Sequence, residues 1–306
     1  MESKAAMKEL RADDICVRLK ATLLEKHKTM QIHSVFTTAV NMICEDVFFT
    51  ILSNRRCIFP MSCRVYGEHN LNEIGIRKGM NVITADDCIF ITEADVFINL
   101  KDSMERDLSF ANDTGLLVPK DLLYKVEILK ELIGDKGSEY DLSTLVTGKY
   151  QNPYADFVMK KLFGLNEAVK KNNLLAGELA GEIAGCGIGL TPSSDDMLVG
   201  YMSAYLADSK AKGRSCDEIY QVTNAMGNKA SKRTNTISGA FLKHCGMGLL
   251  SEDMILLMCT IYSDSKAETV KKSAERILNF GSTSGTDMLT GVVLAIVNLN
   301  GGEYFG

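Results

Sequence analysis

Two segments of this chain repeat one pattern, and that pattern limits the possible folds more than any other feature. TPSSDDMLVGYMSAY (191–205) aligns without gaps with STSGTDMLTGVVLAI (282–296), so that Asp196 falls on Asp287 and Gly200 on Gly291. Each copy has a hydroxyl-rich turn, an aspartate and then a segment that is apolar on almost every side. A helix of that kind is buried among other helices. The repeat therefore predicts two buried, pseudo-repeated helices.

A glycine lies four residues after the aspartate in each copy. Inside a helix a glycine costs about 1 kcal/mol relative to alanine, so something must compensate for it. Glycine allows a close approach, either of the two helices to each other or of a ligand to the backbone. If the helices pack as a pseudo-symmetric pair, both N-termini meet, and we expect the functional site there.

The spacing of apolar residues in the rest of the chain changes near its middle. From about Ile32 to Phe110, short segments rich in Val, Ile, Phe and Thr alternate with turn-forming residues, whereas later segments have apolar residues three and four apart. Residues 4–27 read as an amphipathic helix before the first strands. We predict an α+β fold, in which an N-terminal antiparallel, β-rich, barrel-like domain (1–115) precedes a mostly α-helical domain (116–306). The boundary is expected in the loop-like segment Asn112 to Pro119.

The paired turns have the chemistry of an anion site. A helix N-terminus offers unpartnered N–H groups and a partial positive charge, and glycines before it let an anion approach the main chain. Serine and threonine add hydroxyl donors, and an arginine fork suits a carboxylate or a phosphate. The expected anion-binding residues are Gly187, Gly189, Ser194, Arg233, Thr236, Ser282, Thr283, Ser284, Gly285 and Thr286, and the expected catalytic residues are Thr191, Ser193, Asp195, Asp196 and Asp287.

Two other interpretations of these turns stay open. Ser193-x-x-Asp196 and Ser284-x-x-Asp287 both resemble a capping box, in which the serine and the acid only terminate the helix. The aspartates are also hard oxygen donors, so Mg²⁺ is the one cofactor that they could hold beside a phosphate. Otherwise the sequence predicts no metal site, because no two cysteines have the spacing of a zinc site.

Several functional classes lose support from composition and from missing motifs. The net charge is −5, and lysine and arginine form no basic stripe, so nucleic acid is not an expected partner. No apolar run reaches the ~20 residues of a membrane span, and no secretory signal is visible, so we expect a cytoplasmic protein without membrane contact. Nine cysteines, an odd number, favour reduced thiols. Neither a serine-hydrolase elbow, a phosphate-binding P-loop nor a zinc-protease motif occurs.

GIGLTPSSDDMLVG (187–200) resembles the GxGLTPSGDDfLaG hallmark of a bacterial family long described only as a domain of unknown function. NTISGAFLKHCGMGLLSEDM (235–254) and FGSTSGTDMLTGVVLA (280–295) are similar to two later motifs of that family. The family includes the AllH subunit of oxamate carbamoyltransferase, an enzyme of anaerobic allantoin breakdown. That enzyme converts oxalurate and phosphate to oxamate and carbamoyl phosphate, and the resemblance implies that it acts with two other subunits.

The resemblance implies a carbamoyltransferase subunit whose ligands are small anions. A non-catalytic protein that binds or senses a small carboxylate or phosphate is the alternative. The chain departs from the hallmark at Ser194, where glycine is usual, and in CGIG (186–189), where a proline is common. It also lacks the Ser-Thr-Arg-Thr motif of the aspartate and ornithine carbamoyltransferases, so their mechanism does not carry over.

Overall fold

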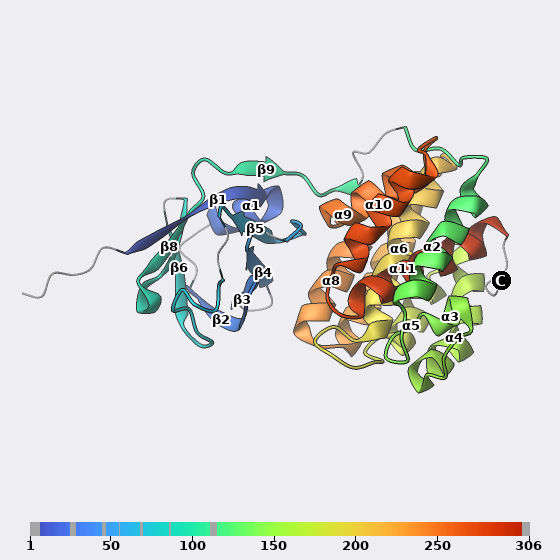
Figure 1. Cartoon of the computed structure of the whole chain (residues 1–306), viewed down its shortest axis with the longest axis horizontal. Coiled ribbons are helices and arrows are strands. Elements are labelled where there is room, and N and C mark those ends of the chain that lie inside the picture. Colours follow the sequence, from blue (N-terminus) through green and yellow to red (C-terminus); the bar gives the residue numbers. More distant parts are fainter. Residues whose placement is uncertain are drawn as a thin grey trace, which may run out of the picture. The chain divides into compact units, whose positions relative to one another are not determined.

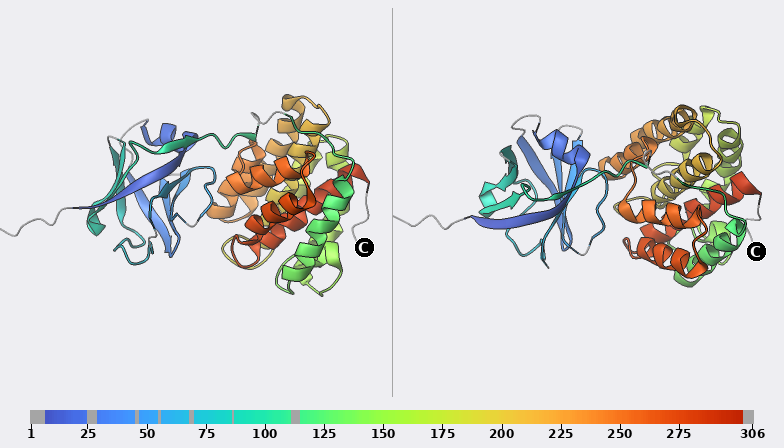
Figure 2. Two further views of the ribbon diagram at one scale, coloured as in Figure 1. Left: turned by 45° about the horizontal axis from the view of Figure 1, so that its top comes forward. Right: turned by 90° about the horizontal axis from the view of Figure 1, so that it is seen from above.

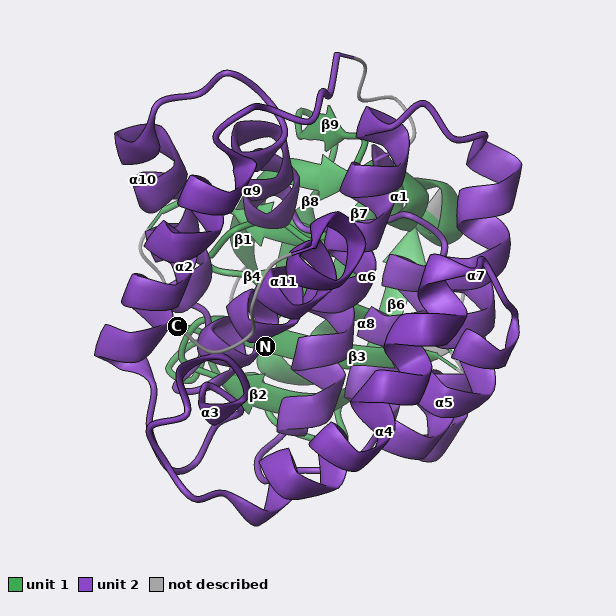
Figure 3. Ribbon diagram, turned by 90° about the vertical axis from the view of Figure 1, so that its right-hand side faces the viewer, with its two compact units in different colours: residues 1–108 green, residues 109–306 purple. Residues whose placement is uncertain are grey.

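The chain divides into two compact units, residues 1–108 and 109–306, which Figures 1 and 3 show as a strand-rich and a helical part. The structure is a computed structural model, and it describes residues 7–24, 29–44, 47–54, 56–67, 70–85, 87–110 and 115–301. Of the residues expected at the boundary, Asn112 and Asp113 lie outside the described residues.

Unit 1 is a strongly curved sheet (Figure 2). Its strands are β1 (Lys8–Cys16), β2 (Thr29–Phe36), β3 (Ala39–Cys44), β4 (Val47–Leu52), β5 (Ser62–Val65), β6 (Asn81–Ala85), β7 (Cys88–Ile91), β8 (Val96–Asn99) and β9 (Met104–Arg106). They follow the order β5-β4-β3-β2-β6-β7-β8-β1-β9, and a further pairing of β5 with β1 joins the sheet to itself. The predicted barrel-like domain is therefore confirmed.

The pairing within this sheet is mostly antiparallel. Parallel pairing occurs between β4 and β5 and where β1 meets β8 and β9. Buried aliphatic side chains such as Val40, Met42 and Ile51 form the interior. Gly79 forms a tight turn before β6 with a φ of +88°, a conformation that glycine adopts without strain.

The prediction of a helix over residues 4–27 is wrong for the first part of that segment and confirmed for the second, and residues 4–6 and 25–27 lie outside the described residues. Residues Lys8–Cys16 form β1, and the helix α1 covers only Val17–Leu24. Within β1, Leu10 and Ala12 are buried while Glu9 and Arg11 are exposed, which is the alternation of a strand. Because β1 pairs with β8 and β9 and also with β5, tertiary pairing that closes the sheet decides the conformation here.

Unit 2 is helical. Its helices are α2 (Leu122–Lys136), α3 (Thr144–Thr147), α4 (Pro153–Lys170), α5 (Leu175–Ile183), α6 (Ser193–Ala211), α7 (Cys216–Ala230), α8 (Thr236–Gly246), α9 (Glu252–Ile261), α10 (Ala267–Leu278) and α11 (Ser284–Asn300), with a short 3₁₀ turn η3 (Ser231–Arg233) between α7 and α8. Together with unit 1 they give the predicted α+β fold. None of the described helices is long and apolar enough to cross a membrane.

The two repeated segments form α6 and α11, which lie in the middle of the helical unit (Figure 3). Almost every residue of both helices is buried, as their all-round apolarity predicted. Their glycines are the points of closest contact. A Cβ atom on Gly200 would lie 1.9 Å from the carbonyl oxygen of Met288, and a Cβ atom on Gly291 would lie 1.9 Å from the carbonyl oxygen of Met197. The repeated glycines thus let the two backbones touch in a pseudo-twofold arrangement.

Replacing either glycine should separate the helices. Gly200→Ala and Gly291→Ala each place a methyl group against a backbone carbonyl oxygen of the other helix. We expect each to lower the free energy of unfolding by about 3 kcal/mol or more, although alanine has the better helix propensity. Urea unfolding followed by circular dichroism measures the loss.

Gly164 in α4 is the matched control, because a Cβ there would make ordinary contacts of 3.5 and 3.6 Å with the side chain of Leu179. Gly164→Ala should be neutral or stabilising by up to about 1 kcal/mol. Equal effects at all three positions would contradict the close packing of α6 against α11.

Candidate functional site

The N-termini of α6 and α11 meet, as the pseudo-symmetric pairing requires. Thr191 Oγ1, just before α6, lies 3.0 Å from Ser284 Oγ, the first residue of α11. Thr191 also donates a hydrogen bond of 2.8 Å to Asp196 Oδ2. Residues that are 93 positions apart in the chain therefore share one polar cluster.

The glycine-rich loop before α6 folds back onto the helix. Gly185, Gly187 and Gly189 all have positive φ values, of +78°, +129° and +101°, which side chains rarely allow. The Cys186 N–H donates to Ser194 Oγ, and the Ser194 N–H donates to the Cys186 carbonyl oxygen, each at 2.9 Å. Ser194, which replaces the glycine of the hallmark, thus anchors the loop.

The capping-box interpretation of the serines is wrong. The N-cap positions of α6 and α11 are Pro192 and Thr283, and neither helix has a side-chain cap hydrogen bond. Other helices of the same unit do have such caps, from Asn152, Ser215, Asn235 and Ser251. Instead, Ser193 Oγ is buried and makes no hydrogen bond of normal geometry with any described residue.

Three buried carboxyl groups lie at these helix starts. Asp195 accepts a hydrogen bond of 2.7 Å from the Gly185 N–H and another from the Thr234 hydroxyl. Asp196 accepts from Thr191, and Asp287 Oδ1 accepts from the Leu142 N–H at 2.7 Å. Asp287 Oδ2 is buried and lacks a partner among the described residues.

Burial without a cation keeps these acids from ionising normally. Burial raises the pKa of Asp196 to about 7, and the hydroxyls of Thr191 and Ser284 only partly oppose it. Burial also raises the pKa of Asp287 well above its ordinary range, against the lowering effects of the Leu142 N–H and the Ser193 hydroxyl. Burial also raises the pKa of Asp195. The pKa of each repeated aspartate is therefore lowered by the serine hydroxyl of the other copy: Ser284 acts on Asp196, and Ser193 acts on Asp287.

The described residues contain no group of three or more His, Cys, Asp or Glu side chains that could hold a metal ion. The three aspartates hold the loop, the turn at Thr234 and the segment at Leu142 against the two helix starts. The described residues therefore give no ligand cluster that supports the Mg²⁺ interpretation. None of the nine cysteines, all of which the structure describes, is in a disulfide.

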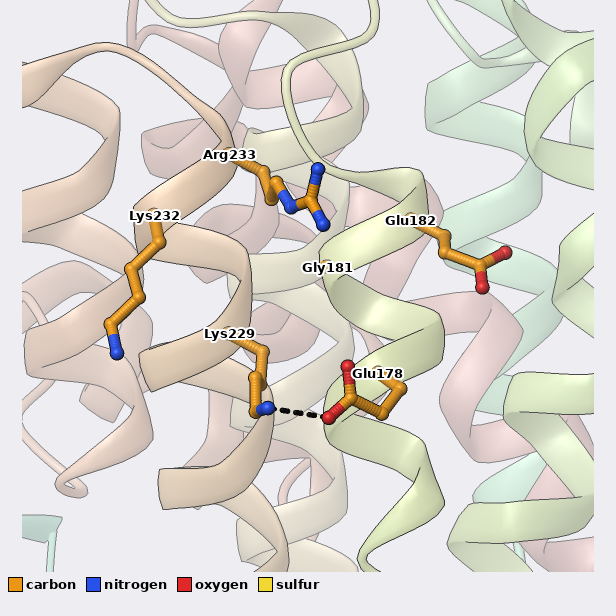
Figure 4. A pocket seen from close by; sticks show the side chains of 6 residues that line it. All are labelled: Glu178, Gly181, Glu182, Lys229, Lys232 and Arg233. Carbon is orange, nitrogen blue, oxygen red and sulfur yellow. Dashed lines mark ion pairs between the residues drawn. The ribbon is translucent and has the colours of Figure 1, made fainter.

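Arg233 lies beside the glycine loop but not at the Thr191–Ser284 contact. Its carbonyl oxygen lies 2.6 Å from where a Cβ of Gly185 would be. Its side chain lines a groove between α5 and α7 (Figure 4), together with Lys232 and with Lys229, whose Nζ pairs with Glu178 at 2.5 Å. The remaining lining residues are Gly181 and Glu182.

The other expected anion-binding residues differ in exposure. Ser282, Gly189 and Thr236 are exposed, Gly187, Thr283 and Ser284 are half-buried, and Ser194, Gly285 and Thr286 are buried. A Cβ on Gly285 would lie 2.2 Å from the carbonyl oxygen of Ile277. The lack of a side chain at Gly285 therefore serves the packing of α11 against the end of α10.

Some of the hydrogen-bond donors that hold the aspartates and the glycine-rich loop were not among the site residues expected from the sequence. The Thr234 hydroxyl binds Asp195, and Asn235 donates from Nδ2 to the Leu190 carbonyl oxygen at 3.0 Å. The Leu142 N–H binds Asp287 from 145 positions away. Thr234 and Asn235 stand in the hydroxyl-rich turn before α8, which is a detectable signal, but a backbone donor such as that of Leu142 leaves no trace in the sequence.

The buried acid makes stability depend on pH in a defined direction. Because the pKa of Asp196 is about 7 in the folded chain, its contribution is fully present below about pH 4 and is lost as the pH rises through about 7. Asp196→Asn removes this dependence. From about pH 5 to about pH 8, the wild-type chain should lose about 3 kcal/mol relative to Asp196→Asn in urea unfolding. Parallel pH curves for the two proteins would refute this.

The loop glycines should differ in their tolerance of a side chain. A Cβ on Gly187 would lie 2.5 Å from the Ser193 nitrogen, whereas a Cβ on Gly189 would have no neighbour nearer than 3.8 Å. Gly189→Ala should cost about 1–2 kcal/mol of stability from backbone strain alone, and Gly187→Ala clearly more, because the loop must also leave the helix start. Thermal unfolding compares them, and an equal loss would argue against the loop packing.

Comparison with known families adds to this geometry. Residues 183–296 match the family described as oxamate carbamoyltransferase subunit AllH, and residues 8–106 match the AllH family N-terminal domain. No solved structure matches the chain. The first match contains the glycine loop, α6 and most of α11, and the second covers the strands of unit 1. The chain belongs to the AllH family.

Proposed function

We propose that this chain is the AllH-type subunit of an oxamate carbamoyltransferase and that it binds a small anionic substrate where α6 and α11 begin. The family description supports the subunit role and the reaction class. The observation that carries the position of the site is the contact of 3.0 Å between Thr191 Oγ1 and Ser284 Oγ, which brings the two repeated turns together.

The surroundings of that contact suit a phosphate or carboxylate. Two helix starts, and so two positive dipole ends, meet there, and neither start has a side-chain cap hydrogen bond. The N–H groups of Ser194 and Gly285 already donate to the carbonyl oxygens of Cys186 and Phe280, so the dipoles and the hydroxyls carry the proposal. Thr191 and Ser284 are half-buried, so they can be reached from solvent, and the exposed Gly189 and Ser282 lie on the same two turns. These residues are the proposed ligands of the anion.

The reaction needs no nucleophile from the protein. Moving a carbamoyl group between the oxamate nitrogen and a phosphate oxygen requires that both substrates be held together and that charge on the carbamoyl oxygen be stabilised. The hydroxyls of Thr191 and Ser284 are the proposed donors for that charge. Each has one hydrogen, which must turn from Asp196 to the substrate when the substrate binds. A buried acid whose pKa is raised to about 7, as in Asp196, could also exchange a proton at neutral pH.

Arg233 is the proposed ligand of the second anion, the phosphate or carbamoyl phosphate. It is exposed, and the ion pair described in its groove joins Lys229 to Glu178 and does not involve Arg233. Its turn is fixed to the site because the neighbouring Thr234 hydroxyl donates to Asp195 and the Asn235 amide donates to the Leu190 carbonyl. A guanidinium fork can bind a phosphate group with two hydrogen bonds, while oxamate is held at the starts of α6 and α11.

Ligand binding tests the proposal. Oxamate and carbamoyl phosphate should each raise the melting temperature of the chain, because they bind only the folded state. The double variant Thr191→Val/Ser284→Ala should weaken binding by about tenfold or more, since it removes two hydroxyl donors. Thr22→Val, which removes a hydroxyl bonded to the Arg18 carbonyl within α1 of unit 1, is the control and should bind normally.

Activity then separates an enzyme subunit from a binding protein. Formation of carbamoyl phosphate from oxalurate and phosphate should appear when the chain is combined with the other subunits and should fall with Thr191→Val/Ser284→Ala. Ligand binding without any contribution of these hydroxyls to turnover would favour a sensor. A flat melting temperature with every small anion would refute the site.

A further inference from the structure

Three carboxyl groups at a proposed anion site raise an electrostatic problem. Two other buried aspartates of this chain have cations, since Asp14 pairs with Arg64 and Arg106 and Asp208 pairs with Lys212. No cation is among the groups that perturb Asp195, Asp196 or Asp287. A bound anion would add one more negative charge in a poorly solvated place, where repulsion is strong. The site can hold an anion only if some of these acids are neutral.

Asp287 is the most deeply buried of the three acids, at 0% exposed. Its Oδ1 already accepts from the Leu142 N–H at 2.7 Å, and its Oδ2 is buried without a partner among the described residues. Ser193 lies beside it, is 1% exposed, and its Oγ also lacks a partner there. Among the described residues no cation is found beside this carboxyl, and a buried charge without a cation is costly. A neutral Asp287 can instead give its hydrogen to Ser193 Oγ.

The charges around Asp287 favour the same state. The charged groups that face it are Asp196 from α6 and Asp141 from the segment before α3, and both are carboxyls. Its other neighbours, the Leu142 N–H and the Ser193 hydroxyl, are neutral. Asp196 differs, because Thr191 already donates to its Oδ2, and Asp195 has two donors of its own.

Resting on the anion site proposed above, we propose that Asp287 is a positioning residue that acts as a neutral carboxylic acid. Its hydrogen is shared with Ser193, and its neutrality allows the starts of α6 and α11 to accept an anion. When Asp287 is ionised in the free protein, it takes one proton from solvent as the anion binds and returns it when the anion leaves. Proton binding and anion binding at this site are therefore coupled.

Oxamate is a suitable probe, because its charge does not change between about pH 6 and about pH 9. Since Asp196 also titrates, the comparison is Asp196→Asn against the double variant Asp196→Asn/Asp287→Asn. In the single variant the Kd for oxamate should rise with pH, by up to about tenfold per pH unit at the alkaline end. In the double variant it should stay near the low-pH value, because asparagine is a permanently neutral analogue.

Calorimetry gives a second readout. Titration of Asp196→Asn with oxamate in two buffers of different ionisation enthalpy measures proton uptake, which should be positive at the alkaline end and absent in Asp196→Asn/Asp287→Asn. Asp208→Asn is the matched control, since it removes a buried carboxyl at the far end of α6 and should leave the proton uptake unchanged. A purely structural Asp287 would alter the melting temperature but not the pH dependence of Kd.

The outcomes separate this inference from the function on which it rests. Oxamate binding with a pH-independent Kd and no proton uptake would overturn the role of Asp287 and leave the anion site in place. No oxamate binding at any pH would overturn the anion site and the coupling with it. Carbon-13 NMR of the aspartate carboxyl groups in the oxamate complex checks the neutral state directly, and an Asp287 that is ionised in that complex at about pH 7 would overturn the inference.

Discussion

The contact of two helix backbones at Gly200 and Gly291 is the constraint on which the rest of unit 2 depends. Each glycine, because it has no side chain, leaves room for a backbone carbonyl group of the other helix. This contact fixes the position of α6 relative to α11. Their starts are then held next to each other, and the turns that precede them are brought together. The polar cluster of Thr191, Ser284 and the aspartates is thus a consequence of helix packing.

The same packing explains why acids are buried without cations. Each repeated aspartate stands in the first turn of a helix that is enclosed on all sides, and each faces the serine of the other copy. A carboxyl group near a helix start is favoured by the dipole, but burial opposes its ionisation. The balance leaves Asp196 with a pKa of about 7 and that of Asp287 well above its ordinary range, so the cluster can exchange protons near neutral pH.

The sequence predicted the parts of the structure that a repeated local pattern determines. The burial of α6 and α11, their glycine contact and the meeting of their starts all followed from the alignment of 191–205 with 282–296. The strand β1 was missed, because its charges and aliphatic residues fit a helix until pairing with β5, β8 and β9 is known. The capping boxes were wrong for a similar reason, since the caps of α6 and α11 are not the serines of the motif. The Leu142 N–H could not be foreseen, because a backbone donor is not encoded by residue type.

The central claim is that the starts of α6 and α11 form one anion site. A crystal structure of the chain grown with oxamate tests it most directly. The account predicts oxamate within hydrogen-bond distance of both Thr191 Oγ1 and Ser284 Oγ. Oxamate bound only in the groove of Arg233 and Lys232, with the Thr191–Ser284 contact unchanged at 3.0 Å, would contradict it.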